Sequence, residues 1–190
     1  MALGAEEFGD IRKPTGVMKE RIIRLIAFDV RPRRIAYTVF ETPTHLLDWG
    51  VKMVGPSPTA GPRVTSMLKA YRPSVLVLRS ISSGSRRDHP RTQELLSAIE
   101  AEAKQSVITV AFVTARELEV FFRQHGRVTK DQIAEAIGEW FPQLAAQVPP
   151  QRKAWQPEHW RMPLFDAMAT AMAYLAEEQV SPDASLKSSE

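Results

Sequence analysis

The chain has 190 residues, of which 44% are hydrophobic and 25% are charged, a balance typical of one globular domain with a full core. It contains no cysteine, which excludes disulfides, thiol catalysis and thiolate metal sites. The formal net charge of +3 is compatible with a nucleic-acid partner but does not by itself indicate one.

The first half of the chain predicts three strands. Residues 1–20 lack hydrophobic periodicity and are expected to form a loose leader, followed by a domain over 21–179 and a polar tail over 180–190. Strands are predicted at about 21–29, 35–41 and 45–54, and the short links between them indicate an antiparallel meander. Asp29 is expected where the first strand ends. There its carboxylate either opens to water for chemistry or simply accepts hydrogen bonds in the turn.

The second half of the chain alternates helices with strands. Helices are predicted over 62–71, 92–105, 115–124, 129–141 and 163–178, and strands over 74–79 and 107–113. The apolar run 74–79 is typical of a strand buried on both faces and parallel to the first strand. We therefore expect an α/β fold. Its mixed five-stranded sheet has three antiparallel meander strands, then two parallel strands, with helices on both faces. The loop 142–162 is long for a compact domain, which is often a sign of function.

Three short motifs stand at the ends of these elements. The first is Ile26-Ala27-Phe28-Asp29, followed by Arg33 and Ala36-Tyr37. The second runs from Gly126 to Ile133 and contains Lys130 and a capping-box pattern, and the third is Asp166-Ala167-Met168-Ala169-Thr170-Ala171. In this order and on these elements, the motifs resemble those of the RuvC-like Holliday-junction resolvases, which have the ribonuclease H-like fold. The resemblance covers roughly residues 22–178.

The resemblance implies phosphodiester hydrolysis with two Mg²⁺ or Mn²⁺ ions, which clustered carboxylates would hold. Asp29 and Asp166 would be the catalytic residues and two of the metal ligands. Glu158 and His159, in the loop before the last helix, are candidates for further ligands. For Asp166 the alternative is a carboxylate that stabilises the first turn of a helix. For Glu158 and His159 the alternative is that they are simply polar side chains of a polar loop.

The resemblance also implies a nucleic-acid partner, more readily a DNA junction than RNA, and a homodimer. Lys130 and Arg33 would contact the nucleic acid, and the basic loop with Arg86, Arg87 and Arg91 would grip phosphates. Alternatively, Lys130 is only a surface residue of the capping box and the loop is only solvated. No apolar run approaches the ~20 residues of a membrane span, so we expect no membrane partner and a cytoplasmic protein.

The chain departs from the family pattern at several positions. Arg79 stands where the family has a Glu, Pro163 where it has an acid or a His, and Arg31 where it has a Gly. An arginine that points into a metal site would repel the ions. Two hypotheses follow: an endonuclease with a depleted carboxylate site, and a non-catalytic binding or scaffolding protein. An ion pair from Arg79 to Asp29 or Asp166 would favour the second. A sheet with a different strand order would instead indicate an unrelated α/β domain.

Overall fold

The computed structural model describes residues 24–55, 60–82, 84, 89–151, 153 and 155–180. The predicted leader 1–20 lies outside these residues, as do the tail beyond residue 180 and the loop arginines Arg86 and Arg87. The elements of the described part are, in chain order, β1 (Leu25–Arg31), β2 (Arg34–Thr42), β3 (His45–Met53), α1 (Ala60–Tyr71), β4 (Val75–Arg79), α2 (Pro90–Gln105), β5 (Thr109–Val113), α3 (Ala115–Gln124), α4 (Lys130–Trp140), the 3-10 helix η1 (Pro142–Gln147) and α5 (Met162–Val180).

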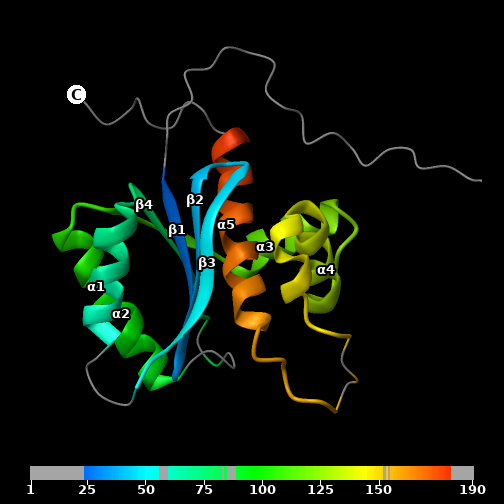
Figure 1. Cartoon of the computed structure of the whole chain (residues 1–190), viewed down its shortest axis with the longest axis horizontal. Helices are drawn as coiled ribbons and strands as arrows, with labels where there is room; N and C mark the ends of the chain where they lie inside the picture. The colour runs from blue at the N-terminus through cyan, green and yellow to red at the C-terminus, as the bar shows by residue number, and fades with distance from the viewer. Residues whose placement is uncertain are drawn as a thin grey trace, which may run out of the picture.

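The strands form one sheet in the order β3-β2-β1-β4-β5. β1 and β2 pair antiparallel, as do β2 and β3, whereas β4 runs parallel to both β1 and β5. This arrangement confirms the predicted mixed sheet and its strand directions (Figure 1). It contradicts the alternative of an unrelated domain with a different strand order.

The first strand differs from its prediction in where it ends. Asp29 pairs with Ala36 inside the ladder, and β1 continues to Arg31, which pairs with Arg34. The prediction that Asp29 ends the strand is therefore wrong. The turn is confined to the two residues between the strands, because the hairpin keeps its backbone pairing up to Arg31 and Arg34.

Side chains of β1 point alternately into two hydrophobic cores, one on each face of the sheet. Leu25 and Ala27 lie in the core that α5 covers, together with residues of α3 and α4. Ile26 and Phe28 lie in the core on the opposite face, under α1 and α2. Figure 1 shows the two layers, with α1 and α2 on one side of the sheet and α5, α3 and α4 on the other. Because successive strand residues point to opposite faces, every odd-numbered residue of β1 faces α5.

Local capping fixes where two helices of the α5 side begin. Thr129 caps α4 with the predicted capping box. Its side chain accepts from the backbone N–H of Gln132, and the Gln132 side chain accepts from the Thr129 N–H. Thr114 makes the same box with Glu117 at the start of α3. These boxes satisfy amide groups that the first helical turn leaves unpaired, and they place Lys130 in the first turn of α4.

The region predicted as a loop over 142–162 is partly helical. Its first residues form η1, which begins at Pro142 and buries Leu144 completely. η1 packs against α4 at Gly138, where an added Cβ would lie 3.6 Å from Ala145 Cα of η1 and would collide with a methyl group of Val148, the next residue after η1. The chain then crosses to α5 through residues 148–161.

Among the described residues, no helix is long and apolar enough to cross a membrane.

A polar contact ties the meander to α1 on the other face of the sheet. Tyr37 of β2 donates to the Asp48 carboxylate of β3 at 3.3 Å, and Tyr71 of α1 donates to the same oxygen. Burial and the neighbouring Asp48 charge raise the pKa of Tyr37. Gly50 lies opposite Tyr37 in the ladder and leaves room for its ring, because an added Cβ would lie 2.9 Å from Tyr37 Cε1.

Candidate functional site

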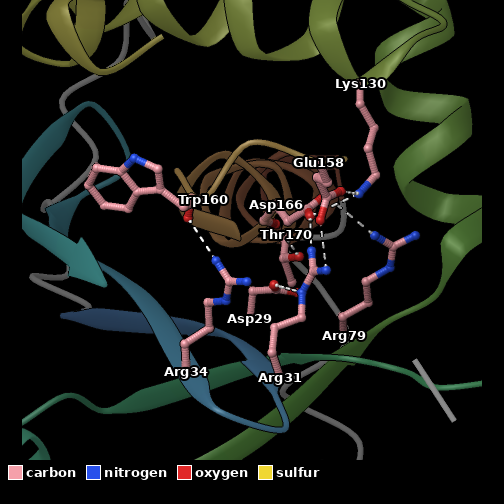
Figure 2. Close-up of polar contacts among 9 residues, drawn as sticks. All are labelled: Asp29, Arg31, Arg34, Arg79, Lys130, Glu158, Trp160, Asp166 and Thr170. Atoms are coloured by element: carbon pink, nitrogen blue, oxygen red, sulfur yellow. Dashed lines mark hydrogen bonds and ion pairs between the residues drawn. The ribbon is translucent and has the colours of Figure 1, made fainter. Parts of the chain in front are cut away.

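Three carboxylates and an arginine meet between the sheet and α5. Asp29 and Arg31 come from β1, Asp166 from the first turns of α5, and Glu158 from the loop before it. Asp29 and Arg31 are two residues apart on a strand, so both side chains point to the α5 face. Figure 2 shows the side chains converging, with Arg31 among the acids.

The Arg31 guanidinium contacts each of the three carboxylates with a different nitrogen. Nε donates to Asp29 Oδ2 at 2.7 Å, Nη1 donates to Glu158 Oε2 at 2.9 Å, and Nη2 donates to Asp166 Oδ2 at 2.6 Å. These distances are those of strong, charge-assisted hydrogen bonds. We call Asp29, Arg31, Glu158 and Asp166 the Arg31 cluster.

Two further cations border the Arg31 cluster. Lys130 Nζ, from the first turn of α4, lies 2.6 Å from Glu158 Oε1 and 3.1 Å from Asp166 Oδ2. Arg79, the last residue of β4, lies with Nη1 3.9 Å from Asp166 Oδ1. Alternate side chains of β4 point to the same face of the sheet, and Val75 and Val77 face α5, so the Arg79 side chain also points toward α5. Three acids and three cations therefore face one another, with a formal charge of zero.

Two of the three acids are buried, so their ionised forms are stabilised mainly by the neighbouring cations rather than by water. Asp29 is 1% exposed and Asp166 is 7% exposed. Burial alone disfavours a charged Arg31, but the nearby Asp29, Asp166 and Glu158 outweigh it and raise the pKa of Arg31 above its ordinary value. Burial likewise disfavours an ionised Glu158, but the hydrogen bond from Lys130 and the charges of Lys130 and Arg31 lower the pKa of Glu158.

The other candidate ligand of the sequence analysis, His159, has a different set of contacts. Its Nδ1 accepts a hydrogen bond from the backbone N–H of Arg161 at 3.3 Å, and its carbonyl accepts from the Met162 N–H at 3.0 Å. Its ring also packs against Trp160, with ring centroids 5.9 Å apart. His159 thus shapes the entry to α5, and its role as a ligand stays a prediction.

The candidate nucleic-acid residues are spread over several elements. Lys130 is part of the rim of the Arg31 cluster, and Arg33 is exposed at the turn between β1 and β2. Arg91, in the first turn of α2, pairs with Glu94 at 3.1 Å and donates to the Gly55 carbonyl at 3.3 Å. Arg86 and Arg87 lie outside the described residues. Their roles in binding remain predictions.

An exposed tryptophan stands next to the Arg31 cluster. Trp160 is 55% exposed, and the Arg161 guanidinium lies over its ring, 4.9 Å from the centroid. Arg34 of β2 donates to the Trp160 carbonyl at 3.2 Å. Figure 2 shows Arg34 reaching from the sheet to Trp160 beside Arg31. The Arg161 guanidinium covers one face of the Trp160 ring, and an exposed ring of this kind can stack on a nucleic-acid base through its other face.

A cavity of about 140 Å³ opens beside the Arg31 cluster, between α3, α4 and α5. Arg79, Lys130 and Asp166 form part of its wall, and the remainder includes apolar side chains such as Phe122 of α3 and Phe165 of α5. The cluster is therefore bordered by a hollow on the side of Arg79 and Lys130.

The acids of the Arg31 cluster have the chemistry that Mg²⁺ or Mn²⁺ prefers, but their arrangement does not fit such an ion. Carboxylate oxygens are the right ligands for these metals. Here one oxygen of each acid is bonded to the same guanidinium. Within the described ranges, no group of three or more His, Asp or Glu side chains has the geometry to hold a metal ion. The site as folded is thus an ion-pair network.

Arg31 was not among the site residues predicted from the sequence, although two features of the sequence pointed to it. The prediction placed residues 30–33 in a turn, where side-chain direction is not fixed. Once the strand extends to Arg31, the alternation of side chains puts Arg31 on the same face of the sheet as Asp29. The departure from the family's glycine at this position was the second signal.

No family model matches the chain, and no curated protein sequence matches it. Among solved structures, RuvC of Thermus thermophilus is similar with a TM-score of 0.62 at 16% identity, over 83% of this chain and 97% of that one. The same protein in complex with a Holliday junction substrate gives a TM-score of 0.62 at 15% identity, over 84% of this chain and 96% of that one.

A second solved resolvase supports the comparison. The yeast mitochondrial Holliday junction resolvase gives a TM-score of 0.57 at 11% identity, over 81% of this chain and 79% of that one. The likeness is one of fold, and it agrees with the element order and the strand order described above. The chain has the ribonuclease H-like fold in the arrangement found in the RuvC resolvases.

Proposed function

We propose that this protein binds branched nucleic acid, DNA in the first place, through the face that carries the Arg31 cluster, and that it does not hydrolyse it. The observation that carries this proposal is the Arg31 guanidinium, which is bonded to all three acids of the cluster. Hydrolysis by metal ions needs those oxygens as ligands. Binding needs only a surface that attracts phosphates and bases.

Charge supports the binding half of the proposal. The three acids are matched by Arg31, Arg79 and Lys130, so the cluster presents no net negative charge to a phosphate backbone. Arg33 adds an exposed positive charge at the β1–β2 turn. Phosphate contacts of this kind supply most of the affinity of proteins for nucleic acid and make it depend on salt.

The preference for branched nucleic acid draws on two supports. RuvC of Thermus thermophilus, which has the same fold, has been solved in complex with a Holliday junction substrate. In this chain, the Trp160 side chain is 55% exposed and follows Glu158 by two residues in the loop before α5. Bases at a branch point are more easily unstacked than bases within a duplex, and stacking on an aromatic side chain contributes about 1–3 kcal/mol per base.

A metal-dependent endonuclease is the second candidate. The convergence of Asp29, Glu158 and Asp166 from three separate parts of the chain favours it, because such a set suits Mg²⁺ once the guanidinium is elsewhere. This candidate requires Arg31 to leave three charge-assisted hydrogen bonds before any ion can enter.

A gel experiment tests both candidates. The full chain is incubated with a labelled four-way DNA junction or with linear duplex, in EDTA, Mg²⁺ or Mn²⁺. Binding is then read on native gels and cleavage on denaturing gels. We expect the junction to be retarded more strongly than duplex in all three conditions, without nicks. Failure to retard either substrate would refute the binding proposal. Nicking in Mn²⁺ that Asp29→Ala abolishes would establish the endonuclease instead.

Matched variants locate the binding face. Arg33→Glu should weaken junction binding and reduce its salt dependence, since one phosphate contact changes the slope by about 1. Lys69→Glu makes the same change of charge in the last turn of α1, on the other side of the sheet, and should leave binding unchanged. Equal effects of the two variants would show that the binding face is not the one proposed.

A further inference from the structure

The Arg31 guanidinium has the shape that three converging carboxylates require. A guanidinium is planar and carries five N–H groups in fixed directions, so it can serve several acceptors at once without moving. In this chain its three nitrogens serve Asp29, Glu158 and Asp166 at 2.7, 2.9 and 2.6 Å. Figure 2 shows that the acids approach the group from different elements rather than along one strand or helix.

The guanidinium is held in this position by the fold and by its charge. Arg31 is the last residue of a central strand, and its side chain is 21% exposed. Its backbone is fixed by pairing with Arg34. Because Asp29 is 1% exposed, movement of Arg31 toward solvent would take a cation away from a buried carboxylate.

Entry of a divalent ion would oppose these contacts. The ion would need carboxylate oxygens that Arg31 and Lys130 already use, and it would add two positive charges beside Arg31, Arg79 and Lys130. Arg31, Arg79 and Lys130 already match the charge of the three acids without it. Both the ligand geometry and the sign of the local charge are therefore unfavourable to the ion.

We propose that Arg31 is a built-in replacement for a divalent metal ion. It binds and orders Asp29, Glu158 and Asp166, and the three acids take up a divalent cation only when the guanidinium is removed. The cluster would then hold its structure in the complete absence of metal. This inference rests on the contacts of Arg31 alone and does not depend on the proposed binding of nucleic acid.

Titration with Mn²⁺ alone tests the proposal on the full chain. Free Mn²⁺ is followed by its electron paramagnetic resonance signal in the presence of wild type, Arg31→Ala, Arg31→Ala/Asp29→Asn and Asp29→Asn. Arg123→Ala is the matched control, because it removes an arginine from a single exposed ion pair with Glu119 at 2.7 Å.

We expect wild type and the Arg123→Ala control to bind Mn²⁺ equally weakly, with no effect of Asp29→Asn in the wild-type background. Arg31→Ala should gain a site at least about tenfold tighter than wild type, and the added Asp29→Asn should remove it. Wild-type binding that Asp29→Asn weakens would overturn the proposal, as would a folded Arg31→Ala that gains no site.

If Arg31→Ala folds poorly in metal-free buffer, thermal melts with and without Mn²⁺ test the same proposal. In that case Mn²⁺ should raise the melting temperature of Arg31→Ala and leave that of wild type unchanged, because only in the variant are the carboxylate oxygens released from the guanidinium. An unfolded variant that Mn²⁺ does not rescue would count against the proposal. Junction binding is not measured in any of these arms, so their outcome is separate from that of the proposed function.

Discussion

Removing the Arg31 side chain should cost the fold a large part of its stability. The change Arg31→Met keeps much of the length of the side chain and deletes the guanidinium. Three charge-assisted hydrogen bonds disappear with it, from Asp29, Glu158 and Asp166. Each such bond contributes about 1.5–3 kcal/mol, and removal of one partner from a buried ion pair costs about 3–5 kcal/mol.

The lower end of that range is the appropriate magnitude here. Lys130 stays within 3.1 Å of both Glu158 and Asp166, so these two acids keep a cation. Asp29 is the most buried of the three and loses its hydrogen bond from Arg31. We therefore expect Arg31→Met to lower the free energy of unfolding by about 3 kcal/mol. For a domain of this size, that corresponds to a fall in melting temperature of about 6–12 °C.

Urea denaturation of four proteins measures this cost: wild type, Arg31→Met, Asp29→Asn and the double variant. The double variant should be less unstable than the sum of the single changes, since the Asp29 charge no longer needs a partner, with a coupling of about 0.5–3 kcal/mol. Arg123→Met, in an exposed helical pair with Glu119, should cost only about 0.5 kcal/mol. If Arg31→Met costs no more than Arg123→Met, the cluster does not stabilise the fold and the reasoning is refuted.

Three other predictions concern acid stability and packing. Because the pKa of Glu158 is lowered in the fold, ionised Glu158 stabilises the protein above the ordinary pKa of about 4.5, and this stabilisation is lost as the pH falls through the lowered value. Urea midpoints measured between about pH 5 and pH 3 should therefore fall more steeply for wild type than for Glu158→Gln. Parallel pH curves for the two proteins would contradict this prediction. Gly50→Ala places a Cβ 2.9 Å from Tyr37 Cε1 and should destabilise by about 1–3 kcal/mol, whereas Gly61→Ala, which meets nothing within 4 Å, should be neutral or stabilising in the same thermal melts. Leu76→Ala, at a completely buried position of β4, should cost about 2–5 kcal/mol in urea unfolding, and a cost below about 1 kcal/mol would show that the site collapses to fill the space.

Most of the fold could be predicted from local patterns in the sequence. The apolar run before Arg79 predicted a strand buried on both faces, and the short links of the meander predicted antiparallel pairing, both of which the sheet confirms. The capping box at Thr129 predicted the start of α4 to within one residue. These features depend on a few neighbouring residues, which is why sequence alone carries them. The region after Pro142 was harder, because η1 is held by its packing on α4 rather than by a periodic pattern.

The candidate site could be predicted only in part. The motifs pointed to Asp29 and Asp166, and both lie in one cluster, bonded to the same guanidinium. Glu158 was named as a candidate from its place in the preceding loop, and it lies in the cluster, whereas the ring nitrogen of His159 serves the backbone of Arg161. Which of two adjacent loop residues turns inward depends on the path of the whole loop, and no spacing rule encodes that path.

The contacts of Arg31 also bear on the order in which the chain folds. They join residues 127 and 135 positions apart, whereas the pairing of β1 with β2 is local and can form early. We expect contacts that close such long stretches of chain to form later than the hairpin, because their closure costs more entropy. Interactions formed after the transition state slow unfolding without speeding folding. We therefore expect the Arg31 contacts to slow unfolding of the native state rather than to speed its formation.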